Sequence, residues 1–356
     1  MSDPSPPASE NLLAVNELLS IPRHELDVRV SRASGAGGQH VNKTSSRVEI
    51  FWNIPASRAQ IIAAFASIYL VWGSTYLAIR YAIETIPPFI MGGLRFLVSG
   101  AMLYAWARYR GAPKPTRLHW RNAVIAGAFL LLGGNGAVVW AEQFVPSGLT
   151  ALLVSILPFW LVIIEWLRPP RRRPSGLVLV GLVLGFIGII VLVGPGNIGG
   201  HGDIRPLGAW VLILGSLSWA IGSFWSRDAA LPESGLLTTG MEMLGGGGLL
   251  LLVGTLSGEF SDLDIHAISK ASAVGLLYLI TFGSLLGFTS YIWLLDKVSP
   301  ARLGTYAYVN PVVAVLLGWA IAGERLSVRT GVAAAIVICA VALITSARST
   351  ATVQSG

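Results

Sequence analysis

Apolar and polar positions divide this chain into two unequal parts, and the change falls near Ala59. The shorter, N-terminal part carries charges and brief alternating stretches that are typical of β-strands. Beyond Ala59, ten long apolar stretches follow one another, each close to the roughly 20 residues that a helix needs to span a bilayer. The predicted membrane helices are Gln60–Tyr81, Pro88–Ala107, Asn122–Trp140, Ser147–Leu167, Gly176–Gly194, Leu207–Trp225, Gly235–Leu256, Ala271–Leu295, Arg302–Ala322 and Thr330–Ser346. The pattern predicts an all-α integral membrane protein with ten transmembrane helices, preceded by a short, incomplete α/β segment.

Composition favours the membrane over a soluble core. Of the 356 residues, 53% are hydrophobic and 12% are charged, whereas soluble domains carry about 25% charged residues. A water-soluble protein of this size has no core large enough to bury so much apolar surface. The alternative, a large soluble protein with buried helices, would require ten such segments in succession, and hydropathy disfavours it.

The distribution of positive charge predicts the orientation in the membrane. A net charge of +7 is at first sight typical of a nucleic-acid-binding protein. With the N-terminus placed in the cytoplasm, the loops on that side carry twelve Lys and Arg residues, and the opposite loops carry four. This excess follows the positive-inside rule. We expect a multi-pass protein of a bacterial-type inner membrane. The excess of positive charge predicts that both termini lie in the cytoplasm, and we interpret the run Arg171–Arg173 as a topology signal.

The membrane part contains an internal repeat. Identical residues recur at fixed offsets: Trp140 and Pro158 match Trp293 and Pro311 with the same spacing of 18, and an offset of 147 pairs Trp72 with Trp219, Gly93 with Gly240 and Gly100 with Gly247. The predicted repeats hold five helices each, over residues 58–200 and 201–347, and a tail follows at 348–356. Because five is an odd number, the second copy enters the membrane from the opposite side. Inverted repeats of this kind are common in transporters, with the substrate site near the midplane.

Several motifs of the membrane part carry a resemblance to a known family. They are WGSTYLAIRYAIETIPP (Trp72–Pro88), GGLRF (Gly92–Phe96), LPFW (Leu157–Trp160), VNPVVAVLLGW (Val309–Trp319) and GERL (Gly323–Leu326). On these motifs, the region from about Gln60 to Ala347 resembles the EamA family of the drug/metabolite transporter superfamily. The resemblance implies ten helices and the export or exchange of amino acids, other metabolites or drugs by alternating access. The chain departs from the family after the fourth helix, where EWLRPPRRRPSG replaces a GERL-like turn.

Ionisable residues within the predicted spans are the first candidates for a transport site, because charged groups are costly in a bilayer. Arg95 in the second helix and Glu242 in the seventh are related by the 147-residue offset. We predict that they pair across the repeat interface in a gating or proton-linked role. The alternative is that Arg95 extends toward the headgroups and Glu242 fills a packing defect.

Aromatic, amide and proline residues complete the predicted substrate cavity. Each proline removes a backbone donor and frees a carbonyl that a solute can use, although a kink without ligand contact fits as well. The tryptophans fit an aromatic cavity or a membrane-interface belt, and Glu142 and Gln143 add polar groups at the outer end of the third helix. The family resemblance implies a cavity between helices one, three, four, six, eight and nine. The predicted cavity residues are Trp72, Arg95, Asn135, Trp140, Pro158, Trp219, Glu242, Tyr291, Tyr308, Asn310 and Pro311.

The N-terminal part carries a separate motif. Val28–Arg32 and Arg47–Ile54 alternate as strands do. The loop between them contains Gly37, Gly38 and Gln39 within the sequence GGQHVNKT. Over about residues 21–56, this segment resembles the GGQ domain of peptide-chain release factors and of peptidyl-tRNA hydrolases that rescue stalled ribosomes. The resemblance implies that the glutamine helps place the water that cleaves the peptidyl-tRNA ester.

The rest of a GGQ domain is missing, because a membrane helix begins where a further helix and strand would follow. A half-domain of this length buries little core. We therefore expect a disordered N-terminus at 1–20, a partial GGQ segment at 21–57 and no working hydrolase.

The leading interpretation is a membrane transporter, in particular an exporter, and not an enzyme. Its predicted partners are the lipid bilayer, a small-molecule substrate and, as a candidate coupling ion, protons. The first alternative is a membrane-tethered GGQ hydrolase or release factor, with the ribosome as its partner. A second, a small multidrug antiporter, needs a carboxylate in the middle of the first helix, but Glu84 lies past the end of that helix. No cofactor is predicted, and no metal site is expected in the membrane, because none of the five histidines lies in a predicted span.

Overall fold

A computed structural model of the chain describes residues 12–16, 19–22, 26–31, 47–52, 57–169, 174–198, 206–295, 297–298, 303, 305–324 and 327–353. The chain divides into two compact units, Met1–Ile61 and Ile62–Gly356.

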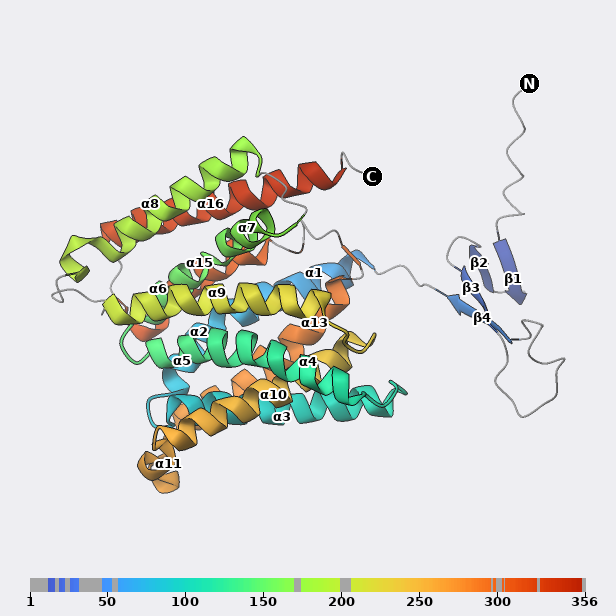
Figure 1. Cartoon of the computed structure of the whole chain (residues 1–356), viewed down its shortest axis with the longest axis horizontal. Helices are drawn as coiled ribbons and strands as arrows, with labels where there is room; N and C mark the ends of the chain where they lie inside the picture. The colour runs from blue at the N-terminus through green and yellow to red at the C-terminus, as the bar shows by residue number, and fades with distance from the viewer. Residues whose placement is uncertain are drawn as a thin grey trace. The chain divides into compact units, whose positions relative to one another are not determined.

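The first unit contains two antiparallel strand pairs (Figure 1). The pair β3 (Leu26–Ser31) and β4 (Arg47–Trp52) has Leu26 opposite Trp52 and Ser31 opposite Arg47, so the two predicted strands are present with bounds shifted by two residues or fewer. The pair β1 (Leu12–Asn16) and β2 (Leu19–Pro22) lies largely in the stretch for which the sequence predicted disorder. The predicted GGQ loop, Gly37 to Gln39, lies outside the described residues.

The second unit is helical throughout its described part (Figure 1). Its elements are α1 (Arg58–Ala66), η3 (Ser67–Val71), α2 (Trp72–Ala82), α3 (Pro88–Tyr109), α4 (Arg117–Gly127), η4 (Ala128–Asn135), α5 (Gly136–Ala141), α6 (Ser147–Val154), α7 (Leu157–Leu167), α8 (Gly176–Ile198), α9 (Pro206–Asp228), α10 (Gly235–Leu256), α11 (Glu259–Asp262), η5 (Ile265–Ala267), α12 (Lys270–Tyr278), η6 (Leu279–Leu286), α13 (Gly287–Leu295), α15 (Tyr306–Ala322) and α16 (Val328–Val353).

Seven helical runs in the described part are long and apolar enough to cross a membrane, and three further apolar helices, Gly176–Val191, Val309–Ala322 and Val328–Ile344, are shorter there. Many large apolar side chains on these helices face outward, including Phe186 on α8 and Trp210 on α9, each 63% exposed. Apolar surface of this extent is the kind that lipid covers. The chain is therefore a multi-pass, all-α membrane protein after its N-terminal unit.

Within the described residues, the observed helices follow the predicted spans with ends shifted by seven residues or fewer, and the fourth span, Ser147–Leu167, divides into α6 and α7. Three of the spans contain π-helical segments that the sequence did not predict. The first predicted span, Gln60–Tyr81, is the run Arg58–Ala82 with η3 in its middle. The third and eighth spans contain η4 and η6. A π-helical segment interrupts the regular pairing of backbone groups and occurs frequently at functional sites.

The two halves of the helical unit meet at an antiparallel pair of equivalent helices, α3 and α10. A Cβ placed on Gly100 would lie 2.9 Å from both Gly240 O and Leu244 N, and a Cβ on Gly247 would lie 3.1 Å from Gly93 O and 2.9 Å from Leu97 N. The two contacts are equivalent, because the 147-residue offset relates Gly100 to Gly247, Gly93 to Gly240 and Leu97 to Leu244. Only glycine lets the two backbones approach so closely.

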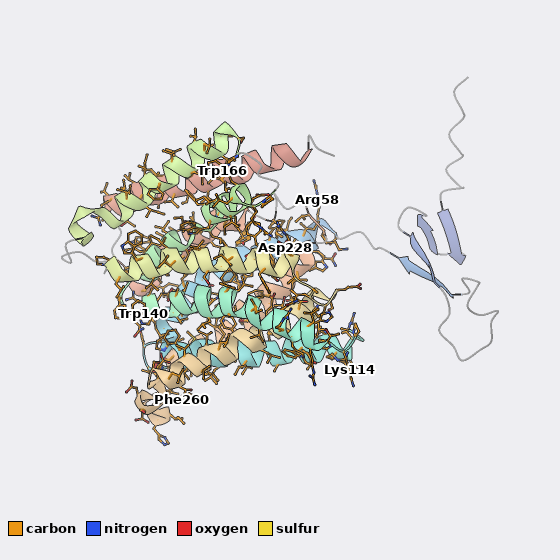
Figure 2. All side chains as sticks on the ribbon, in the orientation of Figure 1. Arg58, Lys114, Trp140, Trp166, Asp228 and Phe260 are labelled. Atoms are coloured by element: carbon orange, nitrogen blue, oxygen red, sulfur yellow. The ribbon has the colours of Figure 1, made fainter. Side chains whose placement is uncertain are left out.

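The connections between helices lie at two ends of the unit. We name the end that carries Glu142, Glu259 and Glu324 the carboxylate end, and the opposite end, with Lys114 and Asp228, the basic end. Figure 2 labels Trp140 and Phe260 at the carboxylate end and Lys114 and Asp228 at the basic end.

Candidate functional site

An aromatic cluster surrounds Trp72, the first residue of α2 after the π-helical turn of η3. The ring centroid of Trp72 lies 5.4 Å from those of Phe288, Tyr291 and Tyr306, which come from α13 and α15. The rings of Tyr291 and Tyr306 also meet each other, with their centroids 5.9 Å apart. Helices from both halves therefore form one aromatic cluster, which includes two of the predicted cavity residues.

Both repeat-equivalent tryptophans pack against a glycine of the other half that lies in or directly after a π-helical segment. A Cβ on Gly287 would lie 2.3 Å from Trp72 Nε1, and a Cβ on Gly134 would lie 2.7 Å from Trp219 Cε3. Side chains of the same two helices also bind π-segment carbonyls. Trp72 Nε1 donates to the carbonyl oxygen of Gly283 in η6 at 3.2 Å. Ser218 Oγ donates to that of Phe129 in η4 at 2.8 Å.

Arg95 and Glu242 are both buried, at 4% and 9% exposure, but they do not pair as predicted. Arg95 Nε donates to Ser284 Oγ of η6 at 3.0 Å, whereas Glu242 accepts a hydrogen bond from Ser226 Oγ of α9. The prediction was wrong because the 147-residue offset relates equivalent positions, and equivalent positions need not touch. Arg95 projects from α3 toward η6, and Glu242 projects from α10 toward α9.

Asn310 joins α15 to the π-helical turn of the first helix. Its side chain is 8% exposed, and in the orientation that satisfies both ends of the amide it donates to the carbonyl oxygens of Ile68 and Tyr69, each at 3.3 Å. Pro311 follows inside α15, where it removes one backbone donor. Nearby, the hydroxyl groups of Tyr69 and Thr305 are hydrogen bonded.

Glu324 connects three helices at the carboxylate end. Its Oε1 accepts from Arg80 Nη1 at 3.1 Å, from Ser147 N at 2.8 Å and from Ser147 Oγ at 2.7 Å. Its Oε2 accepts from Gly148 N at 3.0 Å. A carboxylate at a helix N-terminus binds otherwise unpaired N–H groups and opposes the positive end of the helix dipole. Glu324, which follows α15, therefore stabilises the start of α6 and holds α2 beside it.

Glu259 makes a matching contact with α3. Its Oε1 accepts from Phe89 N at 3.2 Å and its Oε2 accepts from Ile90 N at 2.9 Å. Glu259 and Glu324 both lie in the second half of the chain, and each caps a helix of the first half.

Glu142 differs from these two glutamates. It follows α5 at the carboxylate end, is 6% exposed, and neither of its carboxylate oxygens accepts a hydrogen bond from the residues that the structure describes. Burial raises the pKa of Glu142 well above its usual value, and the charge of Glu324 raises it further, while Arg80 and Arg95 act in the opposite direction. A buried carboxylate without a partner is costly when ionised.

The structure gathers only part of the predicted cavity. Trp72, Arg95 and Tyr291 meet along η6 and α13, and Asn310 joins them through the first helix. Trp219 and Glu242 lie on the other side, with α9 and α10. The remaining predicted cavity residues are placed separately: Asn135 ends η4, Trp140 packs on Phe144, Pro158 lies in the first turn of α7, and the side chain of Tyr308 lies outside the described set.

Sequence reasoning left Glu324, Arg80 and Glu259 out of the candidate site. Glu324 lies in the GERL motif, in a polar turn between two apolar spans, and this pattern could have identified it as a candidate residue. Glu259 offered a weaker signal, since an acidic residue in a loop is ordinary. Their partners are backbone N–H groups at helix starts far away in the sequence, which no local pattern identifies.

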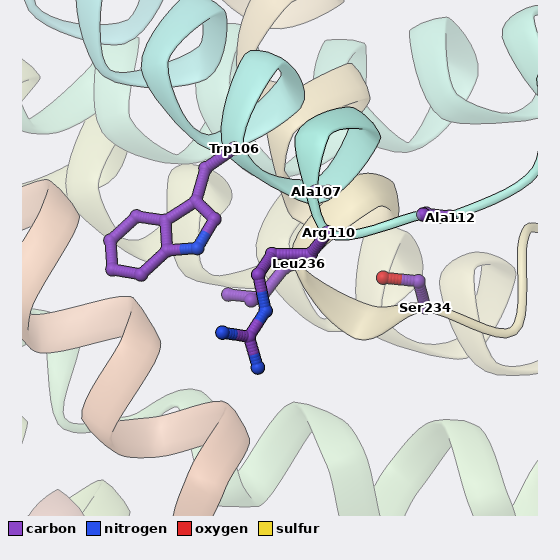
Figure 3. Close-up of a pocket in the computed structure, with 7 residues that line it drawn as sticks. Trp106, Ala107, Arg110, Ala112, Ser234 and Leu236 are labelled. Carbon is purple, nitrogen blue, oxygen red and sulfur yellow. The ribbon is translucent and has the colours of Figure 1, made fainter.

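A hollow of about 470 Å³ opens near the basic end of α3 (Figure 3). Its lining is Trp106, Ala107, Arg110, Gly111, Ala112, Ser234 and Leu236. None of the predicted cavity residues lines it. Within the described part of the chain, no group of His, Cys, Asp and Glu side chains is arranged to hold a metal ion.

Comparison with known families gives two matches. The profile of the "EamA-like transporter family" matches residues 58–194 and again residues 206–346. The profile of the "RF-1 domain" matches residues 14–73, a wider range than the resemblance seen in the sequence.

Individual relatives agree with the first match. The chain is 39% identical over 286 residues to YedA of Escherichia coli K12, described as an uncharacterized inner membrane transporter, and the match covers 80% of this chain and 90% of YedA. It is 24% identical to the uncharacterized transporter YoaV of Bacillus subtilis, covering 79% of this chain and 95% of YoaV. One solved crystal structure of a protein shares the fold, with a TM-score of 0.56 at 19% identity, over 82% of this chain and 99% of the other.

Proposed function

Because the chain belongs to the EamA-like transporter family, we propose that it exports small organic metabolites, such as amino acids or drug-like solutes, by alternating access. The proposed location is a bacterial inner membrane, which is where the name of YedA places that relative. The chain acts as a carrier rather than an enzyme, with a small-molecule substrate as its partner.

The contact between α3 and α10 is the observation that carries this proposal. Equivalent helices that run antiparallel cannot be related by an axis along the membrane normal, because such an axis would make them parallel. A two-fold axis in the membrane plane turns the contact of Gly100 with Gly240 into that of Gly247 with Gly93. This is the geometry of inverted repeats, which build alternating-access transporters. The two separate matches of one family profile to residues 58–194 and 206–346 support the same arrangement.

The proposed unit therefore has ten membrane helices, five in each of the segments 58–200 and 201–347. The seven long apolar runs and the three shorter apolar helices provide this number within the described residues. The excess of Lys and Arg at the basic end supports a cytoplasmic position for that end and for both termini.

The proposed substrate path lies between the helices that meet at η6 and α13. Trp72 and Tyr291 supply aromatic surface there, and Arg95 supplies a buried cation that suits an anionic group of a solute. The contacts of Glu324 close the path at the carboxylate end, and those between Tyr69 and Thr305 lie on the opposite side of the Trp72 cluster along the first helix. The remaining predicted cavity residues enter the path as the halves move.

Transport assays on the purified full-length protein in liposomes test the proposal. A panel of amino acids and related metabolites should include compounds with saturable uptake. Arg95→Ala should reduce this uptake at least about tenfold, since the loss of one buried charge-assisted contact is worth roughly 1.5–3 kcal/mol. Glu84→Gln, a change to an exposed carboxylate outside the path, should leave it unchanged. Uptake that is unsaturable, or equal in Arg95→Ala, contradicts this path.

The RF-1 match over residues 14–73 favours a second candidate function, the hydrolysis of peptidyl-tRNA on the ribosome. The strand pair β3–β4 flanks the sequence positions of Gly37, Gly38 and Gln39. The full chain in detergent, added to stalled ribosomes, should release the peptide, and Gln39→Ala should abolish this release. Equal release by Gln39→Ala, or none by either protein, rejects this function.

A further inference from the structure

Three glutamates are buried at the carboxylate end, and Glu142 differs from the other two. Glu259 and Glu324 each accept hydrogen bonds from two backbone N–H groups of a helix start. Both oxygens of Glu142 lack a partner among the described residues. Two of the carboxylates therefore have hydrogen-bond donors from the protein, whereas no donor among the described residues contacts the third directly.

The titratable groups whose charges interact with Glu142 come from several elements. They are Tyr76 and Arg80 of α2, Arg95 of α3, and Glu324 after α15. Both cations are engaged elsewhere: Arg80 contacts Glu324 at 3.1 Å, and Arg95 contacts Ser284 at 3.0 Å. An ionised Glu142 would compete with Glu324 for Arg80, and that competition links its charge to the contact that ties α2 to α6.

We propose that Glu142 is the proton-carrying residue of the transport cycle. In the conformation seen here, with the contacts of Glu324 intact, Glu142 holds a proton on one carboxylate oxygen. When the helices separate at the carboxylate end, water reaches Glu142 and Arg80 leaves Glu324. Glu142 then gives its proton to water and pairs with Arg80. One O–H bond breaks in the carboxyl group and one forms in water, and no other bond changes. The assignment rests on the proposed transporter function for its role, although the proton site itself does not.

Other acidic residues fit this role less well. Glu324 is ion-paired with Arg80 and accepts hydrogen bonds from Ser147 N, Ser147 Oγ and Gly148 N, so a proton on either of its oxygens would have to displace at least one of these contacts. Glu242 already accepts a hydrogen bond from Ser226. A residue that gains and loses a proton during a cycle needs a site where the neutral form is tolerated and where a cation can arrive, and Glu142 has both.

Infrared difference spectroscopy of the purified full-length protein tests the proton site without a substrate. The wild-type protein should show a protonated-carboxyl carbonyl band that disappears as the pH is raised. The band should be absent from Glu142→Gln, retained in Glu142→Asp at a shifted position, and unchanged in the matched control Glu84→Gln. An identical band in wild type and Glu142→Gln would overturn the assignment.

Proteoliposomes that contain a trapped pH dye then test the role. A mixture of the common amino acids added to one side should move protons with the wild-type protein and with Glu84→Gln. Glu142→Gln should lose this proton movement yet still exchange labelled amino acids across the membrane at least at a tenth of the wild-type rate. No exchange by the wild-type protein would count against the proposed function and leave the infrared result standing. Exchange with proton movement intact in Glu142→Gln would overturn the inference alone.

Discussion

The two halves of the helical unit make equivalent backbone contacts with each other, but different groups cap the N-termini of their helices. At the α3–α10 contact, Gly100 meets Gly240 and Leu244 as Gly247 meets Gly93 and Leu97. At the ends this equivalence stops. Glu259 and Glu324 of the second half cap α3 and α6 of the first half. In the other direction, α10 is capped by the hydroxyl of its own Ser234, which accepts from Leu237 N.

The cross-half ion pairs differ in the same way. The Arg80–Glu324 pair has side-chain exposures of 38% and 8%, whereas the Arg168–Asp228 pair at the basic end has exposures of 44% and 39%. Water screens the charges of an exposed ion pair, whereas a buried carboxylate at a helix N-terminus keeps most of its attraction to the N–H groups and to its cation. Backbone packing thus gives the halves a common architecture, and side-chain polarity makes the carboxylate end the more firmly closed of the two in this conformation.

The largest expected loss of stability tests whether the glycine contacts of the two halves are equivalent. Gly100→Ala and Gly247→Ala each force a methyl group against backbone atoms at 2.9 Å, and overpacking of this kind costs about 1–3 kcal/mol. Both variants should lower the midpoint of thermal unfolding in detergent, and by similar amounts. Gly248→Ala is the matched control, because its Cβ would meet nothing within 4 Å. A large difference between Gly100→Ala and Gly247→Ala would break the equivalence.

The next effect tests the difference between the ends. Glu324→Gln removes the charge from the start of α6 and from Arg80, and hydrogen bonds to charged groups are worth about 1.5–3 kcal/mol. We expect a loss near the lower limit, about 1.5 kcal/mol, because Arg80 is partly exposed and the amide oxygen of Gln can still accept hydrogen bonds. In a background with Ser147→Cys and Cys339→Ser, Glu324→Gln should make thiol labelling at position 147 faster, because the carboxylate end opens more often. Labelling at an unchanged rate would contradict a closed carboxylate end.

A smaller effect concerns pH. The pKa of Glu142 is raised in the folded protein above its usual 4.5. At pH values between 4.5 and the raised pKa, the folded state therefore binds more protons than the unfolded state. The contribution of Glu142 to stability is therefore complete below pH 4.5 and is lost as the pH rises through the raised pKa. The unfolding midpoint of the wild-type protein should fall across this range, and Glu142→Gln should remove that part of the slope. A slope that persists in Glu142→Gln belongs to other groups.

The smallest effect is expected at the basic end. Asp228→Asn breaks the exposed pair with Arg168, and added salt already weakens such a pair. Its unfolding midpoint should match that of Glu84→Gln within experimental error. A loss as large as that of Glu324→Gln would remove the contrast between the two ends.

The sequence predicted the helices well because bilayer-length apolar runs are a local property of the chain. It also gave Trp72 and Tyr291 as cavity residues, and the structure brings their rings together. It failed for Arg95 and Glu242, since a repeat offset identifies equivalence and not distance. The sequence also could not predict that the carboxylate of Glu142 lacks a hydrogen-bond partner among the described residues, because this depends on the packing of several helices. The π-helical turns leave no recognisable pattern in composition.

The glycine contact between α3 and α10 has a mechanical consequence. If the halves rock about their shared axis, this contact is the fulcrum, and displacement grows with the lever arm along each helix. A helix gains about 1.5 Å per residue, so Leu256, nine residues beyond Gly247, lies roughly 13 Å out along the arm. A tilt of about 10° then shifts that helix end by roughly 2 Å, enough to part a hydrogen bond of ordinary length while the fulcrum stays still. The close packing at this glycine contact and the hydrogen bonds at the helix ends therefore belong to one lever.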